Sequence, residues 1–201
     1  MRIVKPASEI LQTTLDPLGL LAEAGSTCYT SDPDSNEEFV ARVMRKGHEL
    51  VIEHASATVR IICDRGVSHE IVRHRLASYS QESTRYCNYS KGRFGKQITV
   101  IEPCFFPPGS EKYRAWYCAC ATAEREYFNL LAAGARPEQA RSVLPNSLKT
   151  ETVMTANMRE WRHFFKLRTA KAAHPQMREI AIPLLGTFKK FVPVLFEDIT
   201  C

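Results

Sequence analysis

A β-branched run, Ala57-Thr58-Val59-Arg60-Ile61-Ile62-Cys63, is followed directly by Asp64. Its β-branched residues predict a strand over 57–63. Asp64 is a residue type that caps helices, and it predicts a helix over about 65–77. Apolar side chains recur along that helix at positions that would face a core, namely Val67, Ile71, Val72 and Leu76.

Further helices are predicted on both sides of this segment. Apolar residues recur near helical period over 37–54, 111–133, 150–170 and 175–191, and Asp, Ser and Asn precede the first of these as N-caps. Gly134 should end the second, and Pro137 should open a short helix that reaches Val143. A second strand, over 97–102, is expected to run antiparallel to the first.

The order of these elements indicates an α+β fold, in which a small, mainly antiparallel sheet packs with helices. No Gly-x-Gly-x-x-Gly follows a strand, and the regular strand-helix alternation of a Rossmann sheet is absent. With 201 residues and a hydrophobic composition of 44%, the chain should form one domain over 1–201.

Composition argues against several classes of protein. The formal net charge of +5 suits an anionic small molecule, and the Lys/Arg runs of a dedicated nucleic-acid binder are missing, so no nucleic-acid partner is expected. No apolar run approaches the ~20 residues of a membrane helix, and the first residues lack the apolar core of a signal peptide, so we expect a cytoplasmic protein. Seven irregularly spaced cysteines predict reduced thiols and no metal site.

A basic segment rich in hydroxyls begins near the end of the helix predicted over 65–77. Arg73-His74-Arg75 is followed, after seven residues, by Ser83-Thr84-Arg85-Tyr86. Guanidinium groups bind phosphate or carboxylate through paired hydrogen bonds, and hydroxyls add short contacts that orient the anion. The segment therefore indicates a phosphate or nucleotide site, although a solvated basic helix end has the same composition.

The helix predicted over 150–170 carries polar and aromatic groups around its circumference. One stripe and a neighbouring i, i+4 pair hold them: Asn157, Trp161, Phe164 and Arg168 on the stripe, and Arg159 with His163 in the pair. Aromatic side chains on a helix with two polar faces favour a position in an interface between subunits. The alternative is an amphipathic helix whose arginines reach solvent.

Four blocks along the chain resemble, in order, those of the flavin-dependent thymidylate synthases. They are Gly47-His48 with Glu53-His54, Arg73-His74-Arg75-x7-Ser83, Ala140-Arg141-x-x-Leu144-Pro145, and Asn157-x-Arg159 with His163 and Leu167-Arg168. The resemblance implies methylation of dUMP to dTMP, with methylenetetrahydrofolate as carbon donor and NADPH as reductant through bound FAD. It also implies a fold peculiar to the family, and a homotetramer in which each active site is shared between subunits.

The resemblance further implies a role for each matching residue. Those implied in FAD binding are Leu50, Glu53, Arg73, His74, Arg75, Gln81, Asn157, Arg159 and His163. Those implied in dUMP binding are Glu70, Ile71, Val72, Arg73, Gln81, Glu82, Ser83, Thr84, Arg85, Arg141 and Arg168. Arg168 is the implied catalytic residue, because a guanidinium against the uracil can stabilise negative charge that develops on the ring.

Ser83 is assigned to the phosphate of dUMP in preference to a role as nucleophile. A serine attacks only when a base takes its proton, and no Ser/His/Asp arrangement is evident around Ser83. His74 would be a poor base, because the neighbouring arginines disfavour its protonated form.

Three features depart from the family pattern. Glu70 and Gln81 stand where Gln and Glu are usual, and we hypothesise that they are compensating partners in one hydrogen-bond network. Leu50 stands where Ser or Thr is usual, which removes a hydroxyl that could meet a flavin phosphate. His174 lies in a segment whose length differs from the pattern, and it is interpreted as a loop or helix-cap histidine.

Two other functions remain open at this point. Tyr79, Tyr86 and Tyr89 interleave with the basic segment and could stack on bases, as in a non-catalytic nucleotide- or RNA-binding module. A flavin-dependent methyltransferase acting on a uracil in RNA would share the chemistry but not the phosphate pocket.

Overall fold

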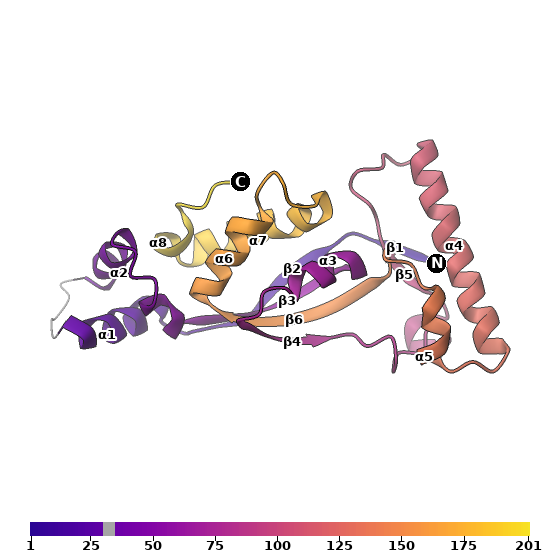
Figure 1. Cartoon of the computed structure of the whole chain (residues 1–201), viewed down its shortest axis with the longest axis horizontal. Coiled ribbons are helices and arrows are strands. Elements are labelled where there is room, and N and C mark those ends of the chain that lie inside the picture. The colour runs from indigo at the N-terminus through magenta and orange to yellow at the C-terminus, as the bar shows by residue number, and fades with distance from the viewer. Residues whose placement is uncertain (30–34) are drawn as a thin grey trace. The chain divides into compact units, whose positions relative to one another are not determined.

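The computed structural model describes residues 1–29 and 35–201 (Figure 1). The chain divides into two compact units, each assembled from three separate stretches. Unit 1 comprises Met1–Ala7, Ile62–Ile71 and Ser80–Thr152, and unit 2 comprises Ser8–Ile61, Val72–Tyr79 and Val153–Cys201. The expectation of a single domain over 1–201 stays a prediction.

A four-stranded sheet has the order β2-β3-β6-β4, formed by Ala7–Thr13, Ser56–Asp64, Lys149–Asn157 and Ala77–Gln81. The pairing of β3 with β6 is antiparallel, because the Met158 amide donates to the Ala55 carbonyl (2.8 Å) while the Thr58 and Thr155 hydroxyls meet at 2.9 Å. The strand predicted over 57–63 is confirmed. So is the α+β class with a small antiparallel sheet.

The second predicted strand has a different partner. β5, Thr99–Ile101, pairs in parallel with β1, Arg2–Val4. The expected antiparallel pairing with the strand over 57–63 was therefore wrong. Short apolar strands pair wherever the tertiary fold buries them, and here that partner comes from the start of the chain.

The prediction of one helix over 150–170 was wrong in its first part. β6 buries every second side chain, from Thr150 to Ala156, and this period of two belongs to a strand. The helix α6 spans only Met158–Arg168, and Asn157 caps it by accepting a hydrogen bond from the Glu160 amide (2.9 Å). Asn157 therefore belongs to the cap and shares no helical stripe with Trp161.

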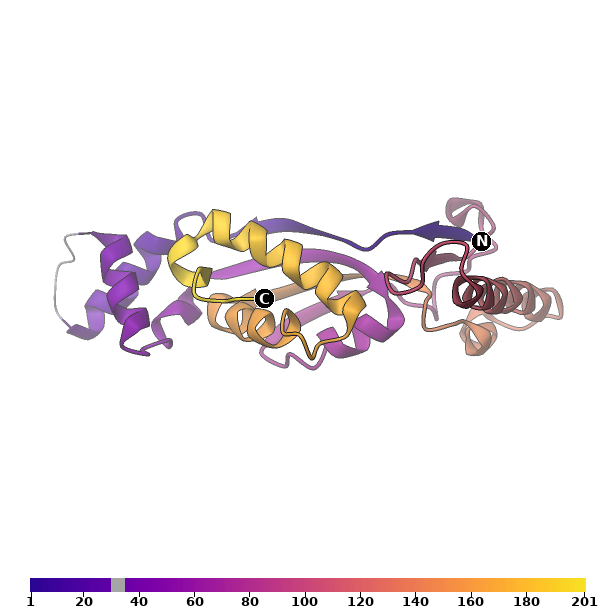
Figure 2. The same cartoon turned by 90° about the horizontal axis from the view of Figure 1, so that it is seen from above.

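Unit 2 buries its aromatic side chains among its own helices. α6 lies beside α7, Pro175–Phe191, on one face of the sheet, and α7 continues into α8, Pro193–Phe196 (Figures 1 and 2). Trp161 packs against Phe165 and Phe188, and its indole N–H donates to the Ala57 carbonyl (3.1 Å). These rings are buried within unit 2, so they give no support to an interface between subunits, which stays a prediction.

The helix predicted over 37–54 is interrupted. α2, Asn36–Arg45, begins at the cap residue Ser35, and the aspartates before it lie outside the described residues. Gly47 then takes a positive φ of 73°, which ends the helix, and a 3-10 helix follows at Val51–His54. The helix α1, Pro17–Tyr29, packs against α2 and was not predicted.

The helix after Asp64 is shorter than predicted. Asp64 caps α3, Arg65–Ile71, by accepting from the Val67 amide (2.8 Å), as expected. The helix ends at Ile71 instead of Ala77, because Ala77–Gln81 joins the sheet as β4. The strand therefore begins at the residue where the sequence predicted the end of a helix.

Unit 1 is built around α4, Glu111–Ala132, which Ser110 caps and Gly134 terminates with a φ of 91°. α5, Pro137–Ala140, and the 3-10 helix Arg141–Val143 confirm the short helix predicted after Pro137. A further 3-10 helix lies at Gly92–Phe94. The core consists of the buried residues Tyr89, Ile98, Val100, Cys120, Tyr127, Ala140 and Leu148.

Two expectations from composition can be compared with the described residues. All seven cysteines are free thiols, as predicted. Within 1–29 and 35–201, the helices that occur are too short or too polar to cross a membrane.

Candidate functional site

The predicted site residues fall in both units. Unit 1 holds Glu70, Ile71, Gln81, Glu82, Ser83, Thr84, Arg85 and Arg141, and unit 2 holds Leu50, Glu53, Val72, Arg73, His74, Arg75, Asn157, Arg159, His163 and Arg168.

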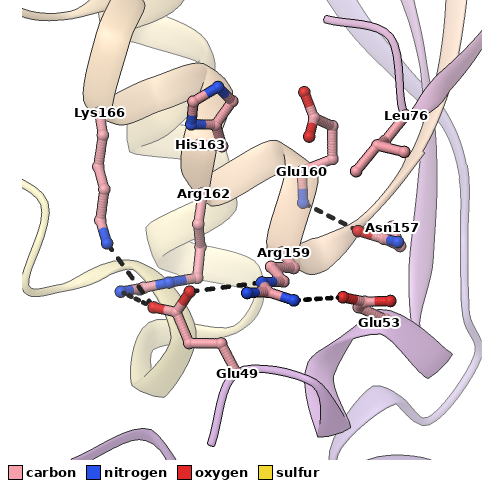
Figure 3. A pocket seen from close by; sticks show the side chains of 9 residues that line it. All are labelled: Glu49, Glu53, Leu76, Asn157, Arg159, Glu160, Arg162, His163 and Lys166. Atoms are coloured by element: carbon pink, nitrogen blue, oxygen red, sulfur yellow. Dashed lines mark hydrogen bonds and ion pairs between the residues drawn. The ribbon is translucent and has the colours of Figure 1, made fainter. Parts of the chain in front are cut away.

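A cavity of about 450 Å³ in unit 2 brings together four residues predicted to bind flavin, Glu53, Asn157, Arg159 and His163 (Figure 3). Its remaining lining is Glu49, Leu76, Glu160, Arg162 and Lys166. The Arg159 guanidinium forms an ion pair with Glu53 across 2.6 Å and lies 3.8 Å from Glu49. Charged donors, an amide and an imidazole around an open cavity are a donor set that suits the polar parts of a flavin nucleotide.

A second set of charges holds the wall of this cavity in place. The buried Arg162 binds Asp198 through two hydrogen bonds of 2.7 Å and lies 3.5 Å from Glu49. Because this guanidinium is already paired, Arg162 serves the structure of the wall. Half-exposed Arg159 and Lys166 are the cations that a ligand would meet.

His74 lies buried in unit 2, at the centre of a hydrogen-bond network. Its Nδ1 is 2.9 Å from Glu160 Oε1, and its Nε2 accepts a hydrogen bond from Arg168 Nε at 3.1 Å. The Tyr79 hydroxyl donates to the His74 carbonyl at 2.6 Å. Burial lowers the pKa of His74 below its usual 6.5, with Arg168 and His163 adding to the shift and Glu160 opposing it. The lowered pKa favours the neutral form of His74, and its causes are burial, Arg168 and His163 instead of the adjacent arginines named from the sequence.

The same residues include a group with potential metal ligands, His74, Glu160 and His163, whose donor atoms lie within 4.8 Å of one another. Both ring nitrogens of His74 are already hydrogen-bonded, and one of them faces a guanidinium. A cation there would have to displace Arg168 from the ring. The arrangement is accounted for as a hydrogen-bond network.

Several predicted flavin contacts lie on the surface of unit 2. Arg73 and Arg75 are exposed on either side of the buried His74. Leu50 is 68% exposed and is absent from the lining of the cavity in Figure 3. Their assignment to FAD stays a prediction.

A second cavity, of about 240 Å³, lies in unit 1 and joins two residues predicted to bind the nucleotide. Arg141 Nη1 donates to the Thr84 hydroxyl at 3.2 Å, and both residues line the cavity. Arg65 and His69 line it as well and were not predicted. Arg65 and His69 are four residues apart on the helix that Asp64 caps, so their side chains share one helix face. This spacing is the signal that could have identified them. Several cationic donors beside a hydroxyl suit a phosphate dianion.

Ser83 and Arg85 lie next to Thr84 in the chain. The Ser83 hydroxyl accepts a hydrogen bond from the Arg85 amide at 3.3 Å, and its role at the phosphate stays a prediction. Arg85 is exposed, and its guanidinium stands 5.2 Å from the centre of the Tyr86 ring.

Gln81 and Glu82 point to different partners within unit 1. The Gln81 amide donates to the Ser68 hydroxyl (2.9 Å) and the Thr150 hydroxyl (3.2 Å). The Glu82 carboxylate binds Lys149 (2.8 Å) and the Tyr89 hydroxyl (3.0 Å), in a third cavity of about 230 Å³. Glu82 therefore lines a different cavity from Thr84, and its predicted contact with dUMP stays a prediction.

The tyrosines of the basic segment offer little to a nucleobase. Tyr89 is buried, and burial together with Glu82 raises its pKa. The Tyr79 hydroxyl donates a hydrogen bond to the His74 carbonyl. Tyr86 is 75% exposed. The stacked array needed by an RNA-binding module is therefore not formed by these three side chains.

The chain is similar to known proteins over most of its length. Residues 9–194 match the protein family described as thymidylate synthase complementing protein. The flavin-dependent thymidylate synthase of Geobacter sulfurreducens is 36% identical over 208 residues, which cover 94% of this chain and 84% of that protein. The flavin-dependent thymidylate synthase of Corynebacterium aurimucosum is 33% identical over 201 residues, which cover 89% of this chain and 78% of that protein.

Solved structures show the same fold. PolB from Streptomyces cacaoi, described as a UMP/dUMP methylase, was solved with 5-Br dUMP and with 5-Br UMP. The first structure has a TM-score of 0.79 at 26% identity, covering 98% of this chain and 96% of that chain. The second has a TM-score of 0.80 at 22% identity, covering 98% and 95%.

Proposed function

The chain belongs to the flavin-dependent thymidylate synthase family, and on that premise we propose that it methylates carbon 5 of dUMP to form dTMP. Methylenetetrahydrofolate supplies the carbon and NADPH the reducing electrons, through bound FAD. The family match over residues 9–194 supports the reaction, and the solved PolB structures support its substrate class.

The observation that carries the chemical step is the hydrogen bond from Arg168 to the neutral ring of His74, at 3.1 Å. Arg168 keeps its positive charge, and His74 adds none beside it. A guanidinium held in this way can stabilise negative charge that develops on the uracil as carbon 5 becomes nucleophilic.

FAD would be held by the residues that line the cavity of Figure 3, with Glu53, Asn157, Arg159 and His163 facing its polar parts. Bound FAD carries reducing electrons from NADPH to the carbon that is transferred. Arg73, His74 and Arg75, with Leu50 and Gln81, are the further flavin contacts that we assign by resemblance. Of these, Arg73 and Arg75 present exposed guanidiniums that suit a diphosphate.

The phosphate of dUMP is assigned to Ser83, Thr84, Arg85 and Arg141. Of these, Thr84 and Arg141 line the 240 Å³ cavity together with Arg65 and His69. The remaining contacts assigned by resemblance are Glu70, Ile71, Val72, Arg73, Gln81 and Glu82. Ser83 acts as a hydrogen-bonding group in this assignment, and its hydroxyl already accepts from the Arg85 amide.

We infer a homotetramer with shared active sites from the resemblance, and a cytoplasmic location from seven free thiols, which persist in a reducing compartment. Light scattering coupled to gel filtration would measure the assembly. A monomer that forms dTMP would overturn the shared site.

The proposed reaction is tested with the purified chain. The protein should be yellow, oxidise NADPH faster when dUMP is added, and convert dUMP to dTMP when methylenetetrahydrofolate is present. UMP and a uracil-containing RNA oligomer serve as competing substrates. The proposal would be overturned if the protein did not bind FAD, or if it methylated the RNA oligomer and did not convert dUMP.

A further inference from the structure

Glu160 occupies a defined position in the first turn of α6. Its amide donates a hydrogen bond to the side chain of the cap residue Asn157, and its own side chain is 8% exposed. Its Oε1 lies 2.9 Å from His74 Nδ1. A carboxylate near a helix N-terminus is stabilised by the helix dipole, so this negative charge is well placed although it is buried.

The ring of His74 is held on every side. It is 2% exposed, and its centre lies 5.0 Å from that of Phe164 and 5.4 Å from that of His163. The Tyr79 hydroxyl binds the backbone carbonyl of His74. The ring cannot turn without displacing these neighbours, so its two nitrogens face fixed partners.

The partners determine which nitrogen carries the proton. Arg168 Nε is always a donor, so His74 Nε2 must accept. The proton then sits on Nδ1, where the Glu160 carboxylate, which can only accept, receives it. With the proton on Nε2 instead, two N–H groups would face each other and the bond to Arg168 would be lost.

We propose that Glu160 is a positioning residue, which acts through His74 to hold the guanidinium plane of Arg168 in the orientation used on the uracil of dUMP. The proposal rests on the function proposed above. Glu160 itself need not touch substrate or flavin. The guanidinium is planar, so a bond that fixes Nε also fixes the direction of the whole group.

The kinetic test compares Glu160→Ala, Glu160→Gln and the wild-type enzyme, with rates expressed per bound flavin. Glu160→Ala should lower kcat by roughly 10- to 100-fold and change KM for dUMP less, because misorientation of a catalytic group acts mainly on the transition state. Glu160→Gln should recover most of the rate, because its amide oxygen still accepts from Nδ1. Glu23→Ala, which removes an exposed carboxylate on α1, is the matched control and should behave as wild type.

A double-mutant cycle separates positioning from a general structural defect. In an Arg168→Ala background, Glu160→Ala should cause no further loss in kcat, since its effect passes through Arg168. Losses that multiply independently would overturn the proposal, and so would an unchanged kcat in Glu160→Ala.

If Glu160→Ala fails to fold, a measurement on the wild-type protein that needs no turnover tests the link from Glu160 through His74 to Arg168. Nitrogen-15 NMR of histidine-labelled wild-type holoenzyme should show His74 protonated at Nδ1 alone, whereas protonation at Nε2 would refute the link. If the wild type forms no dTMP, the proposed function fails, and this spectrum still decides the arrangement of Glu160, His74 and Arg168.

Discussion

Arg168 Nε donates a hydrogen bond to His74 Nε2 over 3.1 Å, although the two residues are 94 positions apart in the chain. This contact changes the interpretation of the basic segment that contains His74. The segment does not act as one uniform phosphate site, because His74 within it is buried and neutral and supports the guanidinium of Arg168 from α6.

Replacing Arg168 should impair the chemical step. Arg168→Ala removes a preorganised charge, for which a loss of about 10²- to 10³-fold in kcat is expected. Arg168→Lys retains the charge but not the Nε donor and should recover only part of the rate. Steady-state formation of dTMP measures both variants, and unimpaired dTMP formation in Arg168→Ala would contradict the electrostatic role.

Arg141 should matter for the phosphate of the nucleotide. Arg141→Ala removes the guanidinium that binds Thr84 in the 240 Å³ cavity. Since a hydrogen bond to a charged group contributes about 1.5–3 kcal/mol, the Kd for dUMP should rise roughly tenfold or more. Binding is measured by calorimetry with dUMP and with deoxyuridine, which lacks the phosphate.

The matched control for Arg141 is Arg136→Ala, an exposed arginine that pairs with Glu138 outside that cavity. It should leave dUMP affinity unchanged. If Arg141→Ala weakened the binding of deoxyuridine as strongly as the binding of dUMP, the assignment of Arg141 to the phosphate would be wrong.

Arg159 should affect retention of the flavin. Arg159→Ala removes a half-exposed cation from the wall of the 450 Å³ cavity and leaves Glu53 without its 2.6 Å partner. The purified variant should carry several-fold less FAD per chain, by absorbance, than Lys171→Ala, an exposed control beyond the end of α6. Equal FAD content in the two variants would exclude Arg159 from the flavin site.

Glu70 and Gln81 should be energetically coupled if their exchange is compensatory. Gln81 donates to Ser68 and Thr150, so Gln81→Glu replaces a donor with an acceptor beside two hydroxyls. Glu70→Gln combined with Gln81→Glu should retain more activity than either single change. Strictly additive losses of kcat/KM in the double-mutant cycle would reject the hypothesis.

His74 should make stability depend on pH below its usual pKa. Burial, with Arg168 and His163, lowers the pKa of His74 in the folded chain, so only the unfolded chain takes up a proton as pH falls through 6.5. The free energy of unfolding is therefore unaffected by the titration of His74 above pH 6.5. Below that pH it falls, by at most about 1.4 kcal/mol per pH unit. Urea unfolding at pH 5 to 8 should show a flatter profile for His74→Gln, and parallel profiles would contradict this.

Much of the fold was predictable where the signals are local. The β-branched run before Asp64, the cap that Asp64 provides and the end of α4 at Gly134 all appear as expected. His174 also caps α7, as interpreted, by accepting from the Gln176 amide. Strand propensity, helix capping and positive φ depend on neighbours in the chain, and sequence patterns report these neighbours directly.

The site was predictable only in part, for the same reason. The ordered blocks identified the family, and Glu53 and Arg159, predicted from separate blocks, form an ion pair. Glu160 escaped prediction, since nothing near it in the chain shows that it reaches His74. Arg65 was missed although its i, i+4 spacing to His69 is a local signal.

The amino-acid sequence alone predicted the α+β class, the family and the residue types that can bind two anionic ligands. Three features became evident only in the folded chain: β6 is a strand, β5 pairs with β1, and His74 is a buried neutral link to Arg168. Local propensities act over a few residues, whereas strand pairing, burial and the position of a proton depend on contacts between residues far apart in the chain.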